Sequence, residues 1–191
     1  MRNISTKYDD LKHDYKALFN SMFINNDVYP RVSFIANKIR SYKSRYESVN
    51  VVPYFITGII HYRESGFNFS THLHNGDPLT WWTINEPKGR PANGKPPFRW
   101  EDSALDAISL KKHLIPKDNS IEGWLYFFEA YNGFGYRIYR KINSPYLWSG
   151  SNHYIKGKYS HDGRYDESLV DKQIGCAVIL KYGMEHALWN L

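Results

Sequence analysis

The chain contains the stretch Val52-Pro-Tyr-Phe-Ile-Thr-Gly-Ile-Ile-His-Tyr-Arg-Glu-Ser-Gly66, which has the clearest helical pattern of the sequence. Its apolar residues recur at spacings of three and four, which places them on one face of a helix: Val52, Phe55, Ile56, Ile59 and Ile60. Pro53 suits the first turn of a helix, and Gly66 suits the residue that ends one. We therefore predict a helix over residues 51–65 whose apolar face lies in the core.

Glu64 is the one carboxylate on or beside this inward face, because it follows Ile60 by four residues. Partial burial and the negative end of the helix dipole both disfavour an ionised carboxylate, which predicts a raised pKa for Glu64. A carboxyl group that stays protonated near neutral pH can act as a general acid toward a glycosidic oxygen. The alternative is a structural salt bridge, for example with Arg63.

The rest of the chain predicts a mainly α fold (α+β) with one long irregular region. Helical patterns are also expected at residues 5–23, 32–46, 100–113, 120–132 and 166–182. Ser5 or Thr6 is expected to cap the first of these, and Phe34 and Leu105 are expected to face the core. Prolines and glycines between residues 71 and 100 predict a long ordered loop or a short hairpin, and residues 144–165 are also expected to be irregular.

The length of 191 residues fits a single domain, with N-terminal helices at 1–48 and a core at 50–182. A net charge of +6 favours an anionic polymer as partner. Lys and Arg are spread along the chain, which weighs against nucleic acid. Cys176 is the only cysteine, so no intramolecular disulfide or multi-cysteine zinc site is expected, and we expect it to be buried in an apolar run.

The N-terminus lacks the apolar segment of a signal peptide, and no stretch approaches the roughly 18 apolar residues of a membrane span. We therefore expect synthesis in the cytoplasm without a signal peptide, no stable membrane anchor and a monomer.

A second carboxylate, Asp77, lies between Gly76 and Pro78 in a predicted tight turn. There its side chain is expected to be solvated and ionised. Two carboxylates in contrasting environments are typical of glycoside hydrolysis, in which one is the acid and the other the base or stabiliser. Thr80 and Thr83 are candidates for holding an attacking water. The alternative is that Asp77 only caps its turn.

Flat aromatic rings and hydrogen-bonding side chains suggest an extended sugar-binding cleft, since aromatic faces stack on sugar rings and amides bind acetamido groups. Aromatic residues make up 17% of the chain, more than core filling alone requires. For Tyr146 and Trp148 the alternative is a packed loop anchor. The candidate substrate contacts are His72, His74, Asn75, Tyr131, Asn132, Tyr136, Tyr146, Trp148, Ser149, Asn152 and His153.

Several motifs resemble goose-type lysozymes and soluble lytic transglycosylases. Glu64-Ser65 at a helix end resembles their Glu-Ser signature, and Glu129-Ala-Tyr-Asn-Gly-Phe-Gly-Tyr136 resembles their later cleft segment. Together with Thr71-His-Leu-His-Asn-Gly-Asp-Pro-Leu79, Gly89-Arg-Pro91 and Ser144-Pro-Tyr-Leu-Trp-Ser-Gly-Ser-Asn-His153, they are similar to a group of phage and prophage lysozyme-like proteins. The resemblance covers roughly residues 50–180.

This resemblance implies a lysozyme-like helical fold and a muramidase that cleaves peptidoglycan between N-acetylmuramic acid and N-acetylglucosamine. It implies Glu64 as the acid, no cofactor, and action on the bacterial cell wall after release from the cell. Transglycosylases of this type use one acid and no second carboxylate, so Asp77 favours hydrolysis by water.

Three other interpretations stay open. A zinc amidase could use His61, His72, His74 and Asp77 as ligands and cut the same polymer elsewhere. A non-catalytic phage protein could bind the cell wall with the same fold. Nucleic-acid binding is supported only by charge and aromatic content.

Overall fold

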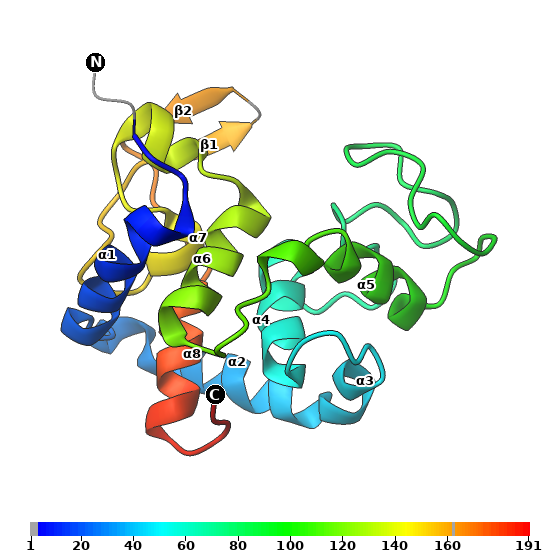
Figure 1. Cartoon of the computed structure of the whole chain (residues 1–191), viewed down its shortest axis with the longest axis horizontal. Coiled ribbons are helices and arrows are strands. Elements are labelled where there is room, and N and C mark those ends of the chain that lie inside the picture. The colour runs from blue at the N-terminus through cyan, green and yellow to red at the C-terminus, as the bar shows by residue number, and fades with distance from the viewer. Residues whose placement is uncertain (1–3, 162) are drawn as a thin grey trace. The chain divides into compact units, whose positions relative to one another are not determined.

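A computed structural model describes residues 4–161 and 163–191 (Figure 1). Helices make up about 49% of it, and the sheet in this part of the chain is the antiparallel pair β1 (Lys158–His161) and β2 (Arg164–Asp166). The predicted mainly α fold is confirmed. Within the same residues, no helix is long and apolar enough to cross a membrane.

The chain packs as two compact units. Unit 1 combines the N-terminal part of the chain up to Ala36 with Pro116–Leu191, and unit 2 is Asn37–Ile115. These borders differ from the division at residues 48–50 that the sequence suggested.

Unit 1 is built on two helix pairs, since α1 packs along α6 and α7 packs on α8 (Figure 1). Fully buried aromatic side chains, among them Tyr15, Trp124 and Phe128, fill its interior. Its helices are α1 (Tyr8–Ser21), η1 (Asn26–Val28), the first part of α2 (Tyr29–Ser41), α6 (Ile121–Asn132), the π-helix η3 (Tyr136–Arg140), α7 (Pro145–Trp148) and α8 (Cys176–Glu185).

Unit 2 is built around α4, against which α3 packs. A Cβ atom on Gly58 of α4 would lie 2.6 Å from Ile39 Cγ2 and 2.9 Å from Tyr46 Cε2, so the helices approach this closely only because residue 58 has no side chain. The helices of this unit are the last turn of α2, α3 (Lys43–Glu47), α4 (Tyr54–Ser65), α5 (Trp100–Ser109) and η2 (Lys112–Leu114).

The predicted helix at residues 51–65 is confirmed as α4. Its apolar face is buried, with Ile56, Ile59 and Ile60 at 0% exposure. Gly66 ends the helix at φ 60°, and its N–H donates to the carbonyl of Tyr62 at 3.0 Å. Pro53 precedes the first turn as the N-cap residue instead of lying within it.

The helices predicted at residues 5–23, 32–46, 100–113 and 120–132 are present, but their borders differ from the predicted ones. The N-cap of α1 is Lys7 and makes no side-chain capping bond, so Ser5 and Thr6 do not cap it. The predicted helix 32–46 is divided into α2 and α3, and the one at 100–113 into α5 and η2. The expected core positions Phe34 and Leu105 are wrong, because they are 64% and 44% exposed.

The predicted last helix, 166–182, is wrong in its first half. The segment before Gly175 contains β2 and an irregular stretch, and α8 begins only at Cys176. The N–H of Gly175 donates to the carbonyl of Ser149 at 2.8 Å, and a Cβ atom there would lie 2.1 Å from the carbonyl oxygen of Leu147. Close contact with the end of α7 therefore fixes the start of α8. Cys176 is fully buried, as predicted.

Residues 71–100 form the predicted irregular region with a short hairpin. Thr71 and Pro78 make an isolated antiparallel bridge, and the N–H of His72 donates to the carbonyl of Asp77 at 2.7 Å. We call residues 71–78 the 71–78 hairpin. The predicted irregular segment 144–165 also contains α7 and β1.

Candidate functional site

Glu64 lies half-buried in the last turn of α4. The tip of the 71–78 hairpin folds back onto this helix end, since a Cβ atom on Gly76 would lie 3.9 Å from the carbonyl oxygen of Glu64. The hairpin that carries Asp77 is therefore adjacent to the candidate acid, and both belong to unit 2.

The carboxylate of Asp77 is hydrogen-bonded to the loop that follows the hairpin. Its side chain is buried, with the residue 7% exposed. Its Oδ2 atom accepts hydrogen bonds from the N–H groups of Ile84 (2.8 Å) and Asn85 (2.9 Å) and from Asn75 Nδ2 (3.0 Å), while Oδ1 accepts one from Asn85 Nδ2 (2.7 Å). Although burial raises the pKa of Asp77, the bonds from Asn85, Ile84 and Asn75 together hold it below its ordinary value.

Asp77 is thus ionised as predicted, but the prediction that it is solvated is wrong. A carboxylate has about four acceptor positions, and this one accepts four hydrogen bonds from the hairpin and the loop after it, three at Oδ2 and one at Oδ1. This geometry supports the turn-shaping alternative for Asp77 over a role as base.

An Asp77→Asn variant is expected to lower the free energy of unfolding by about 2 kcal/mol or more, because it loses the charge that strengthens these bonds and its N–H₂ group would face at least one N–H donor that needs an acceptor. Urea denaturation measures the change. Asp102→Asn, at an exposed position of α5, is the matched control, with an expected change of less than about 1 kcal/mol. Full stability combined with lost activity would instead mark Asp77 as a catalytic group.

The two threonines of the predicted water site differ in accessibility. Thr83 is 3% exposed, and its hydroxyl donates to the carbonyl of Pro87 and accepts from the N–H of Arg90 at 2.9 Å. Thr83 therefore ties the loop together instead of holding an attacking water. Thr80 is exposed, and its contact with a water stays a prediction.

The candidate sugar contacts of the 71–78 hairpin are engaged inside unit 2. His72 is fully buried, with Nε2 donating to the carbonyl of Trp81 at 2.7 Å and Nδ1 hydrogen-bonded to Ser103 Oγ at 2.7 Å. Asn75 Nδ2 donates hydrogen bonds to Asp77 Oδ2 and, at 2.9 Å, to the carbonyl of Asn85. His72 as a sugar contact is therefore wrong, because no part of its ring reaches the surface.

His74 joins the hairpin to α5. Its Nε2 lies 2.8 Å from Asp106 Oδ2, and Arg90 donates to both oxygens of the same carboxylate at 2.8 and 2.6 Å. The His74 side chain is fully buried, and burial lowers its pKa against the opposing effect of Asp106. The geometry gives His74 a structural role in place of a sugar contact.

The ligands of the alternative zinc site are not brought together. His61 is fully buried, its Nδ1 is hydrogen-bonded to Tyr46 Oη at 3.0 Å, and its ring lies 4.5 Å from those of Phe69 and Trp100. Among residues 4–161 and 163–191, no three His, Cys, Asp or Glu side chains are grouped so that they could hold a metal ion. The donor set of the zinc interpretation therefore does not fit a metal.

The folding stability should depend on pH through His61. Burial lowers the pKa of His61 to about 4 from 6.5 in the unfolded chain, so protonation favours the unfolded state. Its contribution is complete above pH 6.5 and is lost as pH falls toward 4, a total of about 3 kcal/mol. Between pH 7.5 and 4.5, the wild type should lose about 2–3 kcal/mol more than His61→Gln in urea denaturation. An equal loss in both proteins would contradict this.

The predicted sugar contacts after residue 140 lie in unit 1 and are mostly structural. Trp148 is fully buried, and Tyr146 and Ser149 are 4% and 3% exposed. The Ser149 hydroxyl donates to the carbonyl of Asp171 at 2.7 Å. Sugar stacking by Trp148 is therefore wrong, since its ring faces the core, and the packed-anchor alternative holds for Tyr146 and Trp148.

Asn152 and His153 attach the same segment to the end of α1. Asn152 Oδ1 accepts from the N–H of Phe23 at 2.9 Å, and His153 Nε2 donates to the carbonyl of Leu18 at 2.8 Å. These bonds give Asn152 and His153 a structural role that requires no ligand. Tyr131 and Tyr136 are half-buried and Asn132 is exposed, so their contact with sugar stays a prediction.

Two notable residues escaped the sequence reasoning. Glu129 is 1% exposed and pairs with Arg137 through bonds of 3.2 and 2.8 Å, while Tyr15 donates its hydroxyl to the same carboxylate. Glu129 follows the buried Leu125 by four residues on the same helix, and this spacing could have predicted that Glu129 is buried. Trp81, directly after the hairpin and its bridge, is 62% exposed and offers a flat ring to solvent.

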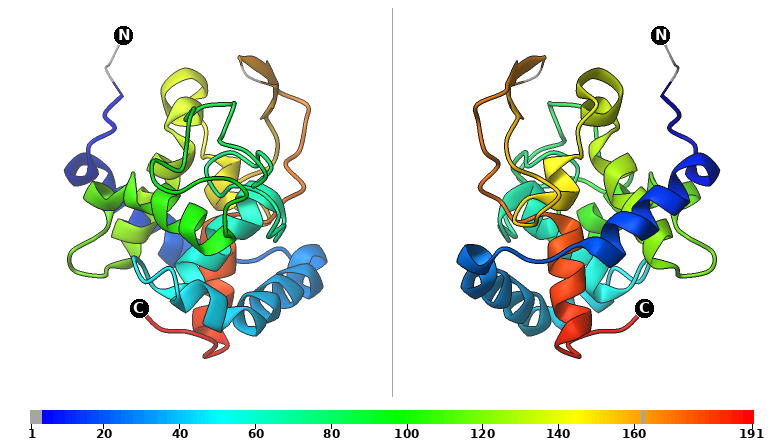
Figure 2. Two further views of the ribbon diagram at one scale, coloured as in Figure 1. Left: turned by 90° about the vertical axis from the view of Figure 1, so that its right-hand side faces the viewer. Right: turned by 90° about the vertical axis from the view of Figure 1, so that its left-hand side faces the viewer.

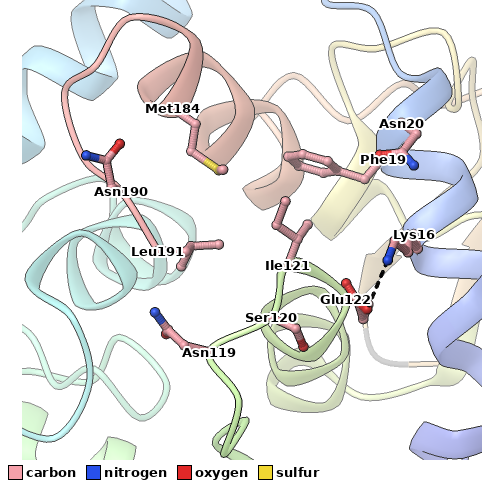
Figure 3. Close-up of a pocket in the computed structure, with 10 residues that line it drawn as sticks. All are labelled: Lys16, Phe19, Asn20, Asn119, Ser120, Ile121, Glu122, Met184, Asn190 and Leu191. Atoms are coloured by element: carbon pink, nitrogen blue, oxygen red, sulfur yellow. Dashed lines mark ion pairs between the residues drawn. The ribbon is translucent and has the colours of Figure 1, made fainter.

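Each unit also contains a pocket away from Glu64. In unit 1, α1, the start of α6 and the end of α8 line a cavity of about 470 Å³, in which Lys16 faces Glu122 and Met184 lies beside Phe19 (Figure 3). In unit 2, loop 91–99 and α5 line a cavity of about 690 Å³. Glu64 lines neither cavity.

Comparisons of the chain with family models, with curated proteins and with solved structures find no match. The lysozyme-like resemblance therefore rests on the quoted motifs alone. Function has to be argued from the residues of the site.

Proposed function

We propose that the chain is a peptidoglycan-cleaving glycosidase that uses Glu64 as its general acid on the bond between N-acetylmuramic acid and N-acetylglucosamine. The observation that carries this proposal is the place of Glu64, half-buried in the last turn of α4 with the 71–78 hairpin folded against that helix end. The helix end disfavours the ionised form, which suits a group that must donate a proton.

In this mechanism the Glu64 carboxyl donates its proton to the glycosidic oxygen while the bond from that oxygen to the sugar carbon breaks. Positive charge then develops on the sugar ring. Asp77 does not act on that ring, because its carboxylate is bound to Ile84, Asn75 and Asn85. It holds the hairpin and the following loop in place beside Glu64.

The engaged state of Asp77 changes the expected product. A hydrolase of this kind needs a second carboxylate to activate water, and the candidate for that role is occupied. We therefore favour the single-acid route, in which a hydroxyl of the substrate sugar attacks its own ring carbon and returns its proton to Glu64. The product would carry an anhydro sugar.

Mass spectrometry of fragments released from purified cell wall tests the proposal. Cleavage between the two sugars with an anhydro end, one water lighter than a reducing end, is expected, and EDTA should leave the rate unchanged. A reducing end would agree with glycosidase activity but would overturn the single-acid route. Cleavage of an amide bond, or loss of activity in EDTA, would overturn the glycosidase.

A further inference from the structure

The positive charge of the chain is concentrated in one segment. Residues 136–165 contain six Lys or Arg and one Asp, a net charge of +5 out of +6 for the whole chain. The rest of the sequence is close to neutral. Lys and Arg themselves are spread along the chain as expected, with 19 of the 25 outside this segment. The local excess arises because acidic residues are scarce in η3, in the β1–β2 hairpin as far as Tyr165 and in the chain between them.

These elements stand at the same end of unit 1 (Figures 1 and 2). Ring contacts join them, since the ring of Tyr159 lies 5.0 Å from that of Tyr136 in η3 and 5.3 Å from that of Tyr165 in β2. Arg140 Nε donates to Tyr159 Oη at 3.1 Å, and its guanidinium lies 4.5 Å from the centre of the Tyr165 ring. The guanidinium is thus held by tyrosines and not by a carboxylate.

We define the Tyr-Arg surface as Arg140, Lys141, Lys156, Tyr159 and Tyr165. Its three cations are exposed and its two tyrosines are half-buried. Arg164 precedes Tyr165 in β2 and therefore points to the other face of the hairpin. Within the described residues, none of the three cations makes an ion pair.

Other basic residues nearby do have partners. Arg137 pairs with Glu129 and Lys158 pairs with Asp171. The last residue of β2 and the residue after it are acidic. The carboxylate of Asp166 accepts hydrogen bonds from the N–H and hydroxyl of Ser168 at 2.8 and 2.6 Å, and Glu167 is exposed. Grouping like charges costs free energy in the folded protein, and an anionic partner would offset that cost.

We propose that the Tyr-Arg surface binds peptidoglycan strands, with its cations on the carboxylates of the stem peptides and its tyrosine rings on the sugars. Guanidinium groups bind carboxylates with directed hydrogen bonds, and aromatic faces pack on sugar rings. This inference rests on the proposed function, since it names a second wall contact of the same enzyme. It lies in unit 1, whereas Glu64 lies in unit 2.

Binding to insoluble cell wall tests the surface. The experiment uses the full chain with Glu64→Gln so that the wall stays intact, and compares it with the same chain carrying Arg140→Gln, Lys141→Gln and Lys156→Gln. We expect the triple change to weaken binding by about 10-fold or more and to reduce its dependence on salt concentration. Circular dichroism and thermal melting verify that the variant is folded.

The matched control removes the same number of charges at exposed positions outside the surface, with Lys88→Gln, Lys112→Gln and Lys172→Gln. It should change binding by less than about 3-fold. Equal losses in the two triple variants would overturn the surface, because total charge would then explain the binding. Unchanged binding in the first variant would also overturn it.

Two further measurements test which chemical group the Tyr-Arg surface binds. An amidase removes the stem peptides and leaves one lactyl carboxylate on each muramic acid. Such wall should bind the parent chain more weakly than intact wall does, because most of the carboxylates are lost. Full binding to the stripped wall would overturn the stem-peptide assignment. A single-stranded oligonucleotide that binds tighter than intact wall, and loses binding in the triple variant, would overturn it in favour of nucleic acid.

Failure of this inference can be distinguished from failure of the proposed function. A wild type that binds wall through the Tyr-Arg surface but releases no fragments would overturn the glycosidase alone. A wild type that cleaves wall while binding is indifferent to the triple change would overturn the surface alone.

Discussion

A Glu64→Gln variant is expected to release fragments from purified cell wall at least about 100-fold more slowly than the wild type, because glutamine cannot donate the proton that the leaving oxygen needs. The side chain keeps its length and shape, so substrate binding should persist. The rate of fragment release and the binding to insoluble wall are measured on the same protein. Slow release with intact binding is the expected pair of results.

Glu86→Gln is the matched control, because Glu86 lies in the loop after the 71–78 hairpin and its side chain is 83% exposed. Its rate should stay within about 2-fold of the wild type. Folding stability separates the acid from the salt-bridge alternative, since replacing a protonated carboxyl by an uncharged amide of the same shape should change stability by less than about 1 kcal/mol. A marked fall in stability with wild-type rates would assign Glu64 to a structural pair.

A Glu129→Gln variant is expected to lower the free energy of unfolding by about 3–5 kcal/mol, because it leaves the buried guanidinium of Arg137 without its counterion. The Arg137 side chain is only 17% exposed, and Glu129 is 1% exposed. Burial and the Glu129 carboxylate also raise the pKa of Tyr15, which donates its hydroxyl to that carboxylate. Guanidinium chloride denaturation, with two-state fits, measures the loss.

Two comparisons isolate the buried pair. Glu122→Gln lies on the same helix but faces Lys16 across 4.0 Å with a 21% exposed side chain, so it should cost less than about 1 kcal/mol. Removing both partners, as Glu129→Leu with Arg137→Leu, should recover part of the loss because no buried charge remains. A double variant less stable than Glu129→Gln would contradict this explanation.

Features with a local cause were predictable from the sequence. The apolar spacing of Phe55, Ile56, Ile59 and Ile60 placed α4 and its buried face, and Gly66 marked its end. The N-cap of α6 also followed its local rule, because Ser120 Oγ accepts from the N–H of Gly123 at 3.2 Å.

Features that depend on distant contacts were not predictable in this way. The start of α8 depends on the bond between Gly175 and Ser149, and the burial of Trp148 depends on the packing of α7 against α8. Asp77 looked like an exposed turn residue because its donors, Ile84 and Asn85, come seven and eight residues later in an irregular loop. No periodic pattern reports such bonds.

The close approach at Gly58 has a consequence for catalysis under the proposed function. Glu64 lies six residues further along the same helix, roughly 9 Å along its axis. A helix transmits a displacement along its length, so a methyl group at residue 58, pressing on Ile39 and Tyr46, would shift the acid without touching substrate. Under the proposed function, the position of the Glu64 carboxyl thus depends partly on the absence of a side chain at residue 58. Substitutions at this residue would change the reaction rate although it does not touch the substrate.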